Sequence, residues 1–256
     1  TNPAKAQAFF AGWLALMHLG RPARARDHFK RMVEFAYGPL SKSKSEFWLA
    51  RAHKALGNNE LANRHYGESA KVRDTFHGLL SRQRISAGDR SIELPPARLP
   101  DAQETERFLA TGAVRAFHLG FPHGLDRRPV LAFYRALGSS LESEGELALM
   151  AQLASHLGDG QGEVRVGKYG VARGLNHYEF AYPLQHLPEY DPLRDPVEEP
   201  MLFAIARQES EFNSTIVSRA GARGVLQVMK ITARHVCRQY RIRCRIEDLL
   251  EDPSYN

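Results

Sequence analysis

The amino-acid sequence predicts a mainly all-α protein, in which a curved superhelix of helical hairpins leads into a C-terminal segment of different character. Two observations predict the hairpins. Apolar residues recur at helical spacing up to about residue 165, and a Leu-Gly turn ends a helix at Leu19-Gly20 and again at Leu56-Gly57. The change of character is marked by five prolines between Tyr182 and Pro200, because proline stops a helix.

The first part of the chain fits helical hairpins stacked in tandem. Residues 9–16 form an aromatic and small-residue helix, and the helix after its turn carries Ala25, Phe29, Met32 and Val33. The same pattern returns at residues 47–52, and a third unit begins at Thr75. A repeat period in the mid-thirties is typical of tetratricopeptide-like solenoids, whose units stack to bury their apolar faces. We expect a helical-repeat superhelical domain over residues 1–95.

More helices are expected after a linker. Turn residues fill positions 86–100, and amphipathic patterns then predict helices over residues 104–119, 129–143 and 144–157. The aromatic and methionine residues of these helices fit core packing better than a cofactor site, so no cofactor or metal is expected. A helix-breaking cluster is expected at residues 158–162, and the prolines described above follow it. We expect residues 96–199 to form a further helical linker domain.

Composition and charge leave several kinds of partner open. The 256 residues include 35 Lys and Arg against 29 Asp and Glu, which gives a net charge of +6 and attracts polyanions. Peptidoglycan, with its peptide carboxylates, is as suitable an anionic partner as nucleic acid. An ordinary basic surface without such a partner would also explain the charge. Nucleic acid is disfavoured because no RNA-binding motif or zinc-finger spacing is present. No stretch of roughly 20 apolar residues predicts a membrane span. The first residues lack a signal-peptide pattern, so an exported protein would be seen here in a mature or trimmed form.

The two cysteines, Cys237 and Cys244, are seven positions apart. On one continuous helix they would be separated by a rise of roughly 10.5 Å, which is beyond disulfide reach. A turn at residues 241–243 would permit a bridge. Free thiols and a disulfide are therefore both open.

The segment after the prolines carries the candidate chemistry. Glu198-Glu199-Pro200 is a favourable helix start, and the helix is expected to run to about Asn213. If Leu202, Ile205 and Ala206 form the buried stripe, Glu209 projects from the apolar face. Glu211, about 200° further round, should face solvent. Burial of Glu209 would favour its protonated form, as a general acid requires.

The periodicity by itself leaves a structural role for Glu209 open, with a backbone donor or an arginine such as Arg207 or Arg223 as its partner. A glycine-rich turn over residues 218–229 follows, where backbone can come close to another group. Thr232 to Tyr240 is then expected to form a helix, and Asp252-Pro253 to begin another.

Two motifs in this segment resemble those of the soluble lytic murein transglycosylases. The first is the run around Glu209-Ser210-Glu211-Phe212-Asn213, and the second runs through Ala220-Gly221-Ala222 and Gly224-Val225-Leu226-Gln227-Val228-Met229. The resemblance covers roughly residues 200–256 and implies a lysozyme-like transglycosylase domain there. The upstream hairpins resemble the superhelical part of the same family less specifically.

The resemblance implies a lyase reaction of the bacterial cell wall in the periplasm. The β-1,4 bond between N-acetylmuramic acid and N-acetylglucosamine would be cleaved with formation of a 1,6-anhydromuramoyl end. Glu209 matches the family's single acid and base, while Ser210, Gln227 and Met229 match residues that line the glycan cleft. The family usually has Leu-Met before the glutamine and Pro-Gly after the methionine, where this chain has Val225-Leu226 and Lys230-Ile231.

The family's cleft is completed by a later Tyr-Asn-containing motif, so we expect the domain to be incomplete at its C-terminus. Two other functions stay open. A lysozyme-like hydrolase would need a second carboxylate to activate water, and none is identifiable because Glu211 is expected on the wrong face. A non-catalytic helical-repeat scaffold would only bind partner proteins.

Overall fold

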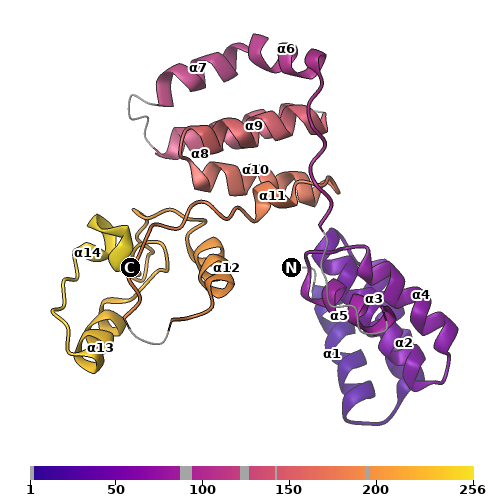
Figure 1. Cartoon of the computed structure of the whole chain (residues 1–256). Helices are drawn as coiled ribbons and strands as arrows, with labels where there is room; N and C mark the ends of the chain where they lie inside the picture. Colours follow the sequence, from indigo (N-terminus) through magenta and orange to yellow (C-terminus); the bar gives the residue numbers. More distant parts are fainter. Residues whose placement is uncertain (1–2, 87–93, 122–126, 142, 194–195) are drawn as a thin grey trace. The chain divides into compact units, whose positions relative to one another are not determined.

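The computed structural model describes residues 3–86, 94–121, 127–141, 143–193 and 196–256, and it divides into two compact units, Thr1–Leu94 and Pro95–Asn256 (Figure 1). Within the described residues the secondary structure is helical, and β-pairing is limited to isolated bridges of Arg223 with Val217 and with Val228. The predicted all-α class is therefore confirmed.

In the described residues of the first unit, five helices pair as the sequence pattern predicts. They are α1 Pro3–Met17, α2 Pro22–Glu34, α3 Pro39–Ala55, α4 Asn59–Ala70 and α5 Phe76–Ile85. Consecutive helices pack against each other from α1 to α5. Both predicted Leu-Gly turns connect helices of this unit, and Gly20 and Gly57 have φ values of 58° and 78° there. Glycine suits these turns because other residues rarely adopt positive φ.

One aromatic core joins the hairpins of the first unit. Phe29 is fully buried, and its ring centroid lies 5.7 Å from that of Trp48. The aromatic ring of Phe47 packs at 5.8 Å from Tyr66. These contacts link α2 to α3 and α3 to α4, so each helix buries its apolar face against the next one, as stacked repeats require.

In its described residues the second unit begins with six helices and ends with the segment that carries the candidate site. Its helices are α6 Ala102–Ala110, α7 Gly112–Gly120, α8 Arg127–Ser140, α9 Glu144–His156, α10 Gly160–Ala172, α11 Tyr178–Ala181, α12 Glu199–Glu209, α13 Lys230–Tyr240 and α14 Asp248–Glu251. Helix α10 packs against α8, α9 and α11 (Figure 1). The expected division of this part at residues 199 and 200 into a linker domain and a lysozyme-like domain stays a prediction.

Two sequence expectations for the second unit are corrected. The single helix expected over residues 104–119 is interrupted at Thr111, whose backbone is extended, and becomes α6 and α7. The glycine cluster expected to break helices at 158–162 instead begins α10. Asp159 caps this helix by accepting a hydrogen bond from the backbone N–H of Gly162 at 2.9 Å, and such a cap offsets the low helix propensity of glycine.

A third cluster of buried residues connects α10 to the C-terminal segment. Val164 of α10 packs with Ala206 of α12 and with Phe212 and Val225, which follow α12. Val164 and Ala206 are both fully buried. Helix α10 is therefore part of the support of the segment that contains Glu209.

A capping box at the start of α6 supplies a pH-dependent contribution to stability. Glu104 accepts a hydrogen bond from the backbone N–H of Asp101 and forms an ion pair with Arg98. The Asp101 hydrogen bond, followed by one from Ser143, lowers the pKa of Glu104 from 4.5 to about 2. Because the folded-state pKa is depressed, this stabilisation is fully present above about pH 4.5 and is lost as the pH falls towards about 2.

We therefore expect Glu104→Gln to lower the thermal unfolding midpoint at neutral pH. The difference from the unsubstituted protein should shrink below about pH 4.5 and close near pH 2. Thermal unfolding followed by circular dichroism across this pH range measures the effect. A difference that stayed constant down to pH 2 would show that the charge of Glu104 is not its source.

Candidate functional site

Glu209 is the last residue of the short helix α12. The helix begins at Glu199 with Pro200 in its first turn, as the sequence predicts, but it ends at Glu209 instead of near Asn213. Glu211 and Phe212 follow with φ values of 54° and 64°. Consecutive left-handed residues other than glycine are uncommon and persist only where the surrounding contacts hold them.

The predicted burial of the two glutamates is wrong. Glu209 is exposed, whereas the side chain of Glu211 is only 19% exposed. The buried side of α12 is marked by Ala206, which is fully buried, while Ile205 is 38% exposed. The helical extrapolation to Glu211 fails because the helix has ended before that residue. Periodicity therefore gives no support to Glu209 as the acid, and its assignment depends on the motif that contains it.

Three side chains of α10 hold the segment that follows Glu209. Glu211 accepts hydrogen bonds from Arg165 Nε and from Lys168 Nζ, both at 2.7 Å. Gln161, which is buried, accepts a bond from Asn213 Nδ2 at 3.2 Å and lies 3.5 Å from the carbonyl oxygen of Ser210. We call Gln161, Arg165 and Lys168 the α10 anchor.

The charge of Glu211 is stabilised by this anchor. Burial by itself would raise the pKa of the Glu211 carboxyl, but the hydrogen bonds and positive charges of Lys168 and Arg165 outweigh it and leave the pKa below its usual value. Glu211 is therefore a structural carboxylate held by two cations. Such a group is poorly suited to activate a water molecule as a second catalytic carboxylate.

Ser210 is buried beside Glu209. Its hydroxyl donates to the carbonyl oxygen of Ala206 at 3.1 Å and so binds the last turn of α12. Ser210, which the motif assigns to the cleft, therefore lies directly at the C-terminal end of α12.

Gln227 and Met229 lie on the glycine-rich turn that leads into α13. Gln227 adopts a φ of 53°, and its Nε2 donates to the carbonyl oxygens of Gly224 at 2.9 Å and of Ile216 at 3.2 Å. Met229 immediately precedes α13 and is 38% exposed. The expected site residues therefore come from two elements, the end of α12 and this turn.

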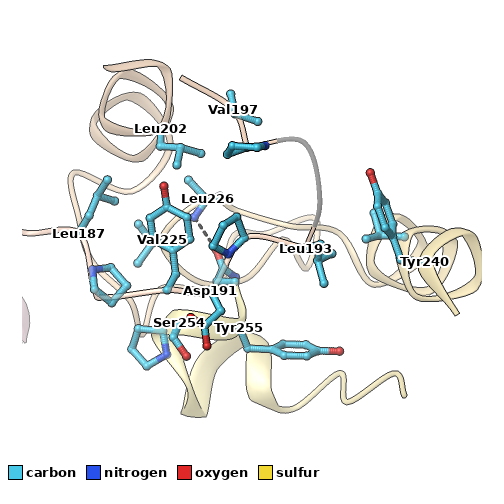
Figure 2. A pocket seen from close by; sticks show the side chains of 17 residues that line it. Leu187, Asp191, Leu193, Val197, Leu202, Val225, Leu226, Tyr240, Ser254 and Tyr255 are labelled. Carbon is cyan, nitrogen blue, oxygen red and sulfur yellow. Dashed lines mark hydrogen bonds between the residues drawn. The ribbon is translucent and has the colours of Figure 1, made fainter. Parts of the chain in front are cut away.

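The turn is closed by contacts that require a glycine. Gly224 has a φ of 74°, and a Cβ atom there would collide with Asn256 and with the carbonyl oxygen of Leu249. Asn256 also accepts from the backbone N–H of Leu226 at 2.6 Å, which Figure 2 shows as a dashed line. The glycine-rich sequence thus serves the close backbone approach that its composition predicts.

An apolar pocket of about 470 Å³ adjoins the turn but contains none of the expected site residues. Leu202 of α12, Leu226 of the turn and Tyr240 of α13 line it (Figure 2). Residues of the proline-rich segment, among them Leu187, Leu193 and Val197, complete the lining. Among the described residues, no His, Cys, Asp and Glu side chains are grouped as a metal site requires. None of the described helices is long and apolar enough to cross a membrane.

The motifs predict Glu209, Ser210, Gln227 and Met229 as site residues, which stays a prediction, but the sequence analysis did not identify the α10 anchor. Gln161, Arg165 and Lys168 follow each other at intervals of four and three residues, which places them on one face of a helix. That spacing was the available signal. The neighbouring glycines obscured this spacing because they predicted that no helix would form there.

Comparisons with known proteins agree with the fold and with the motifs. Residues 189–256 match the family model of the transglycosylase SLT domain. The chain is similar to an inactive mutant of the lytic transglycosylase Slt from Pseudomonas aeruginosa, with 21% identity, a TM-score of 0.74, and coverage of 99% of this chain and 41% of that one. No curated protein sequence matches the chain significantly.

Two further solved structures are similar. One is the 70-kDa soluble lytic transglycosylase in complex with bulgecin A, with 21% identity, a TM-score of 0.66, and coverage of 99% of this chain and 39% of that one. The other is the 70-kDa soluble lytic transglycosylase from Escherichia coli, with 22% identity, a TM-score of 0.65, and coverage of 100% and 40%. The chain spans about two fifths of the length of these proteins.

The described residues form an all-α fold that is similar to the fold of these transglycosylases, with a series of helices followed by the segment that carries the Glu-Ser pair. Within that segment the expected resemblance is confirmed, because residues 189–256 match the family model of the transglycosylase SLT domain.

Proposed function

We propose that the protein is a lytic murein transglycosylase that acts on peptidoglycan glycan strands in the periplasm. The observation that carries this proposal is the position of Glu209-Ser210 at the end of α12, followed by the Gly224 to Met229 turn, inside the segment that matches the SLT domain. The net charge of +6 favours a substrate rich in carboxylates.

In the proposed reaction Glu209 acts first as an acid and then as a base. It protonates the glycosidic oxygen that leaves N-acetylmuramic acid, so that the β-1,4 bond to N-acetylglucosamine breaks. The substrate's acetamido group assists this step, which places the reaction among the exceptions to the two-carboxylate scheme. Glu209 then takes the proton of the muramoyl C6 hydroxyl as that oxygen bonds to the anomeric carbon. The product carries a 1,6-anhydro end, and no water is consumed.

Exposure of Glu209 is compatible with this role because the substrate itself must reach the carboxyl. The proposal assigns Gln227 and Met229 to the glycan cleft. Ser210 is assigned to it as well, although its hydroxyl is bound to the end of α12 in the structure. The α10 anchor supports the proposal differently, since it fixes the chain immediately after Glu209 and thus the direction of that side chain.

The state of Glu211 favours a transglycosylase over a hydrolase. A hydrolase on this scaffold would need a second carboxylate to activate water. The carboxylate nearest to Glu209 in sequence is bound to Arg165 and Lys168 at 2.7 Å each. A single-carboxylate mechanism that uses the substrate's own hydroxyl needs no such group.

Incubation of the full-length protein with purified peptidoglycan tests whether the protein is an enzyme of this kind. We expect soluble muropeptides to be released, and we expect bulgecin A, which is bound to a similar 70-kDa soluble lytic transglycosylase, to suppress the release. Binding to peptidoglycan without any release would favour the helical-repeat scaffold instead.

A further inference from the structure

The two cysteines lie at opposite ends of a turn that reverses the chain after α13. Cys237 is buried, Cys244 is exposed, and both are free thiols. Helix α13 ends at Tyr240, Arg241 adopts a left-handed conformation, and the backbone N–H of Ile242 donates to the carbonyl oxygen of Cys237 at 3.0 Å. Bonds of this kind close helix C-termini. The separation of roughly 10.5 Å that a continuous helix would impose is therefore removed.

The hydroxyl group of Tyr255 contacts both the side chain of Cys237 and the backbone next to Cys244. It lies 3.6 Å from Cys237 Sγ, accepts a hydrogen bond from the backbone N–H of Arg245 at 3.0 Å and donates to the carbonyl oxygen of Arg243 at 3.3 Å. Arg243 and Arg245 flank Cys244, so the backbone on both sides of Cys244 faces the hydroxyl that contacts Cys237. A hydrogen bond with the Cys237 side chain raises the pKa of the Cys244 thiol.

We propose that Cys237 and Cys244 form an intrachain disulfide that fixes the turn after α13. A disulfide requires Cα atoms within about 7 Å and sulfur atoms that face each other. The reversal at Arg241 and the contacts of Tyr255 with Cys237 and with the backbone on both sides of Cys244 favour this arrangement. The inference is independent of the proposed enzymatic function.

The oxidant that the reaction requires is a small-molecule or protein disulfide. The thiolate of Cys244, the exposed partner, attacks one sulfur of that disulfide, forms a mixed disulfide and releases one thiolate. The Cys237 thiolate then attacks Cys244 Sγ, forms the intrachain bond and releases the second thiolate. The two cysteines lose two electrons and two protons in total, and the oxidant becomes two thiols.

Mass spectrometry after thiol labelling tests the proposal. The full chain is equilibrated with oxidised glutathione, denatured, and treated with iodoacetamide before any reduction. We expect no labelling of either cysteine, a mass lower by two hydrogen atoms than that of the reduced chain, and one proteolytic fragment pair joined through Cys237 and Cys244. Two labelled cysteines would overturn the proposal, and so would a bridge that forms only between two chains.

Thermal unfolding with and without a reductant gives a second measurement. The closed loop is short, so reduction should lower the unfolding midpoint by roughly 5 °C. Cys244→Ser is the matched control, because Cys244 is exposed and serine preserves its size. The variant should unfold at the same midpoint in both conditions. An equal effect of the reductant on the variant and on the unsubstituted chain would contradict a role for this pair.

Discussion

Replacing Glu209 by Gln is expected to reduce turnover of peptidoglycan by roughly 10²- to 10⁴-fold, the range typical for loss of general acid-base catalysis. Glutamine preserves the shape of the side chain but has no proton to transfer. Because Glu209 is exposed at the end of α12, its replacement should leave the fold intact. The rate of release of soluble muropeptides measures the effect, and binding of bulgecin A should be largely retained.

Glu199→Gln provides the matched control. Glu199 is an exposed glutamate in the first turn of the same helix, so the substitution makes the same chemical change far along α12 from the motif. We expect its turnover to equal that of the unsubstituted protein. Full activity of Glu209→Gln would refute the assignment of the acid, which now depends on the family motif and not on helix periodicity.

The second large effect is expected at the α10 anchor. Lys168→Met and Glu211→Gln should each reduce kcat by roughly 10- to 100-fold with a smaller change in KM, because misplacement of a reacting group by about 1 Å costs up to 10²-fold. Both variants abolish the same ion pair, whose nitrogen and oxygen atoms lie 2.7 Å apart. Lys168→Met should therefore have little further effect when Glu211 is already glutamine, since substitutions within one network are not additive.

Lys71→Met is the control for this experiment. It removes another 2.7 Å lysine–glutamate pair, with Glu68, that is largely exposed and lies in the first unit. Exposed pairs contribute little, so kcat should not change. Two independent, additive effects of Lys168→Met and Glu211→Gln would argue against a shared positioning role.

The pH dependence gives the anchor a separate signature. The pKa of Glu211 lies below its usual 4.5, so the contribution of its ion pairs to stability is present above pH 4.5 and is lost as the pH falls through the lower, folded-state value. The difference in unfolding midpoint between the unsubstituted protein and Glu211→Gln should shrink in that acidic range.

The sequence predicted the helical hairpins well because their signals are local. Apolar residues at helical spacing fixed the helices, and Gly20 and Gly57 marked turns where positive φ is needed. The start of α12 and the course of α13 were also predicted, since a proline near a helix start and a regular apolar spacing depend only on neighbouring residues.

The exposure of Glu209 could not be predicted from the sequence because it depends on contacts between distant segments. Helix α12 ends early, where Glu211 turns towards Arg165 and Lys168, which are more than forty residues away in sequence. A periodicity argument assumes that the helix continues, and nothing in the local sequence shows that it ends. The start of α10 was missed for a related reason, since the cap from Asp159 to Gly162 overrides the low helix propensity of its glycines.

The mass of the products tests the central proposal most directly. When the full-length protein digests purified peptidoglycan, the proposed reaction predicts muropeptides with 1,6-anhydromuramoyl ends, because the C6 hydroxyl of the substrate replaces the leaving group. Such an end is lighter by one water than a reducing end, and mass spectrometry separates the two. Anhydro-ended products that disappear with Glu209→Gln are the expected result. Products with reducing ends would show that water is the acceptor and would contradict the transglycosylase proposal.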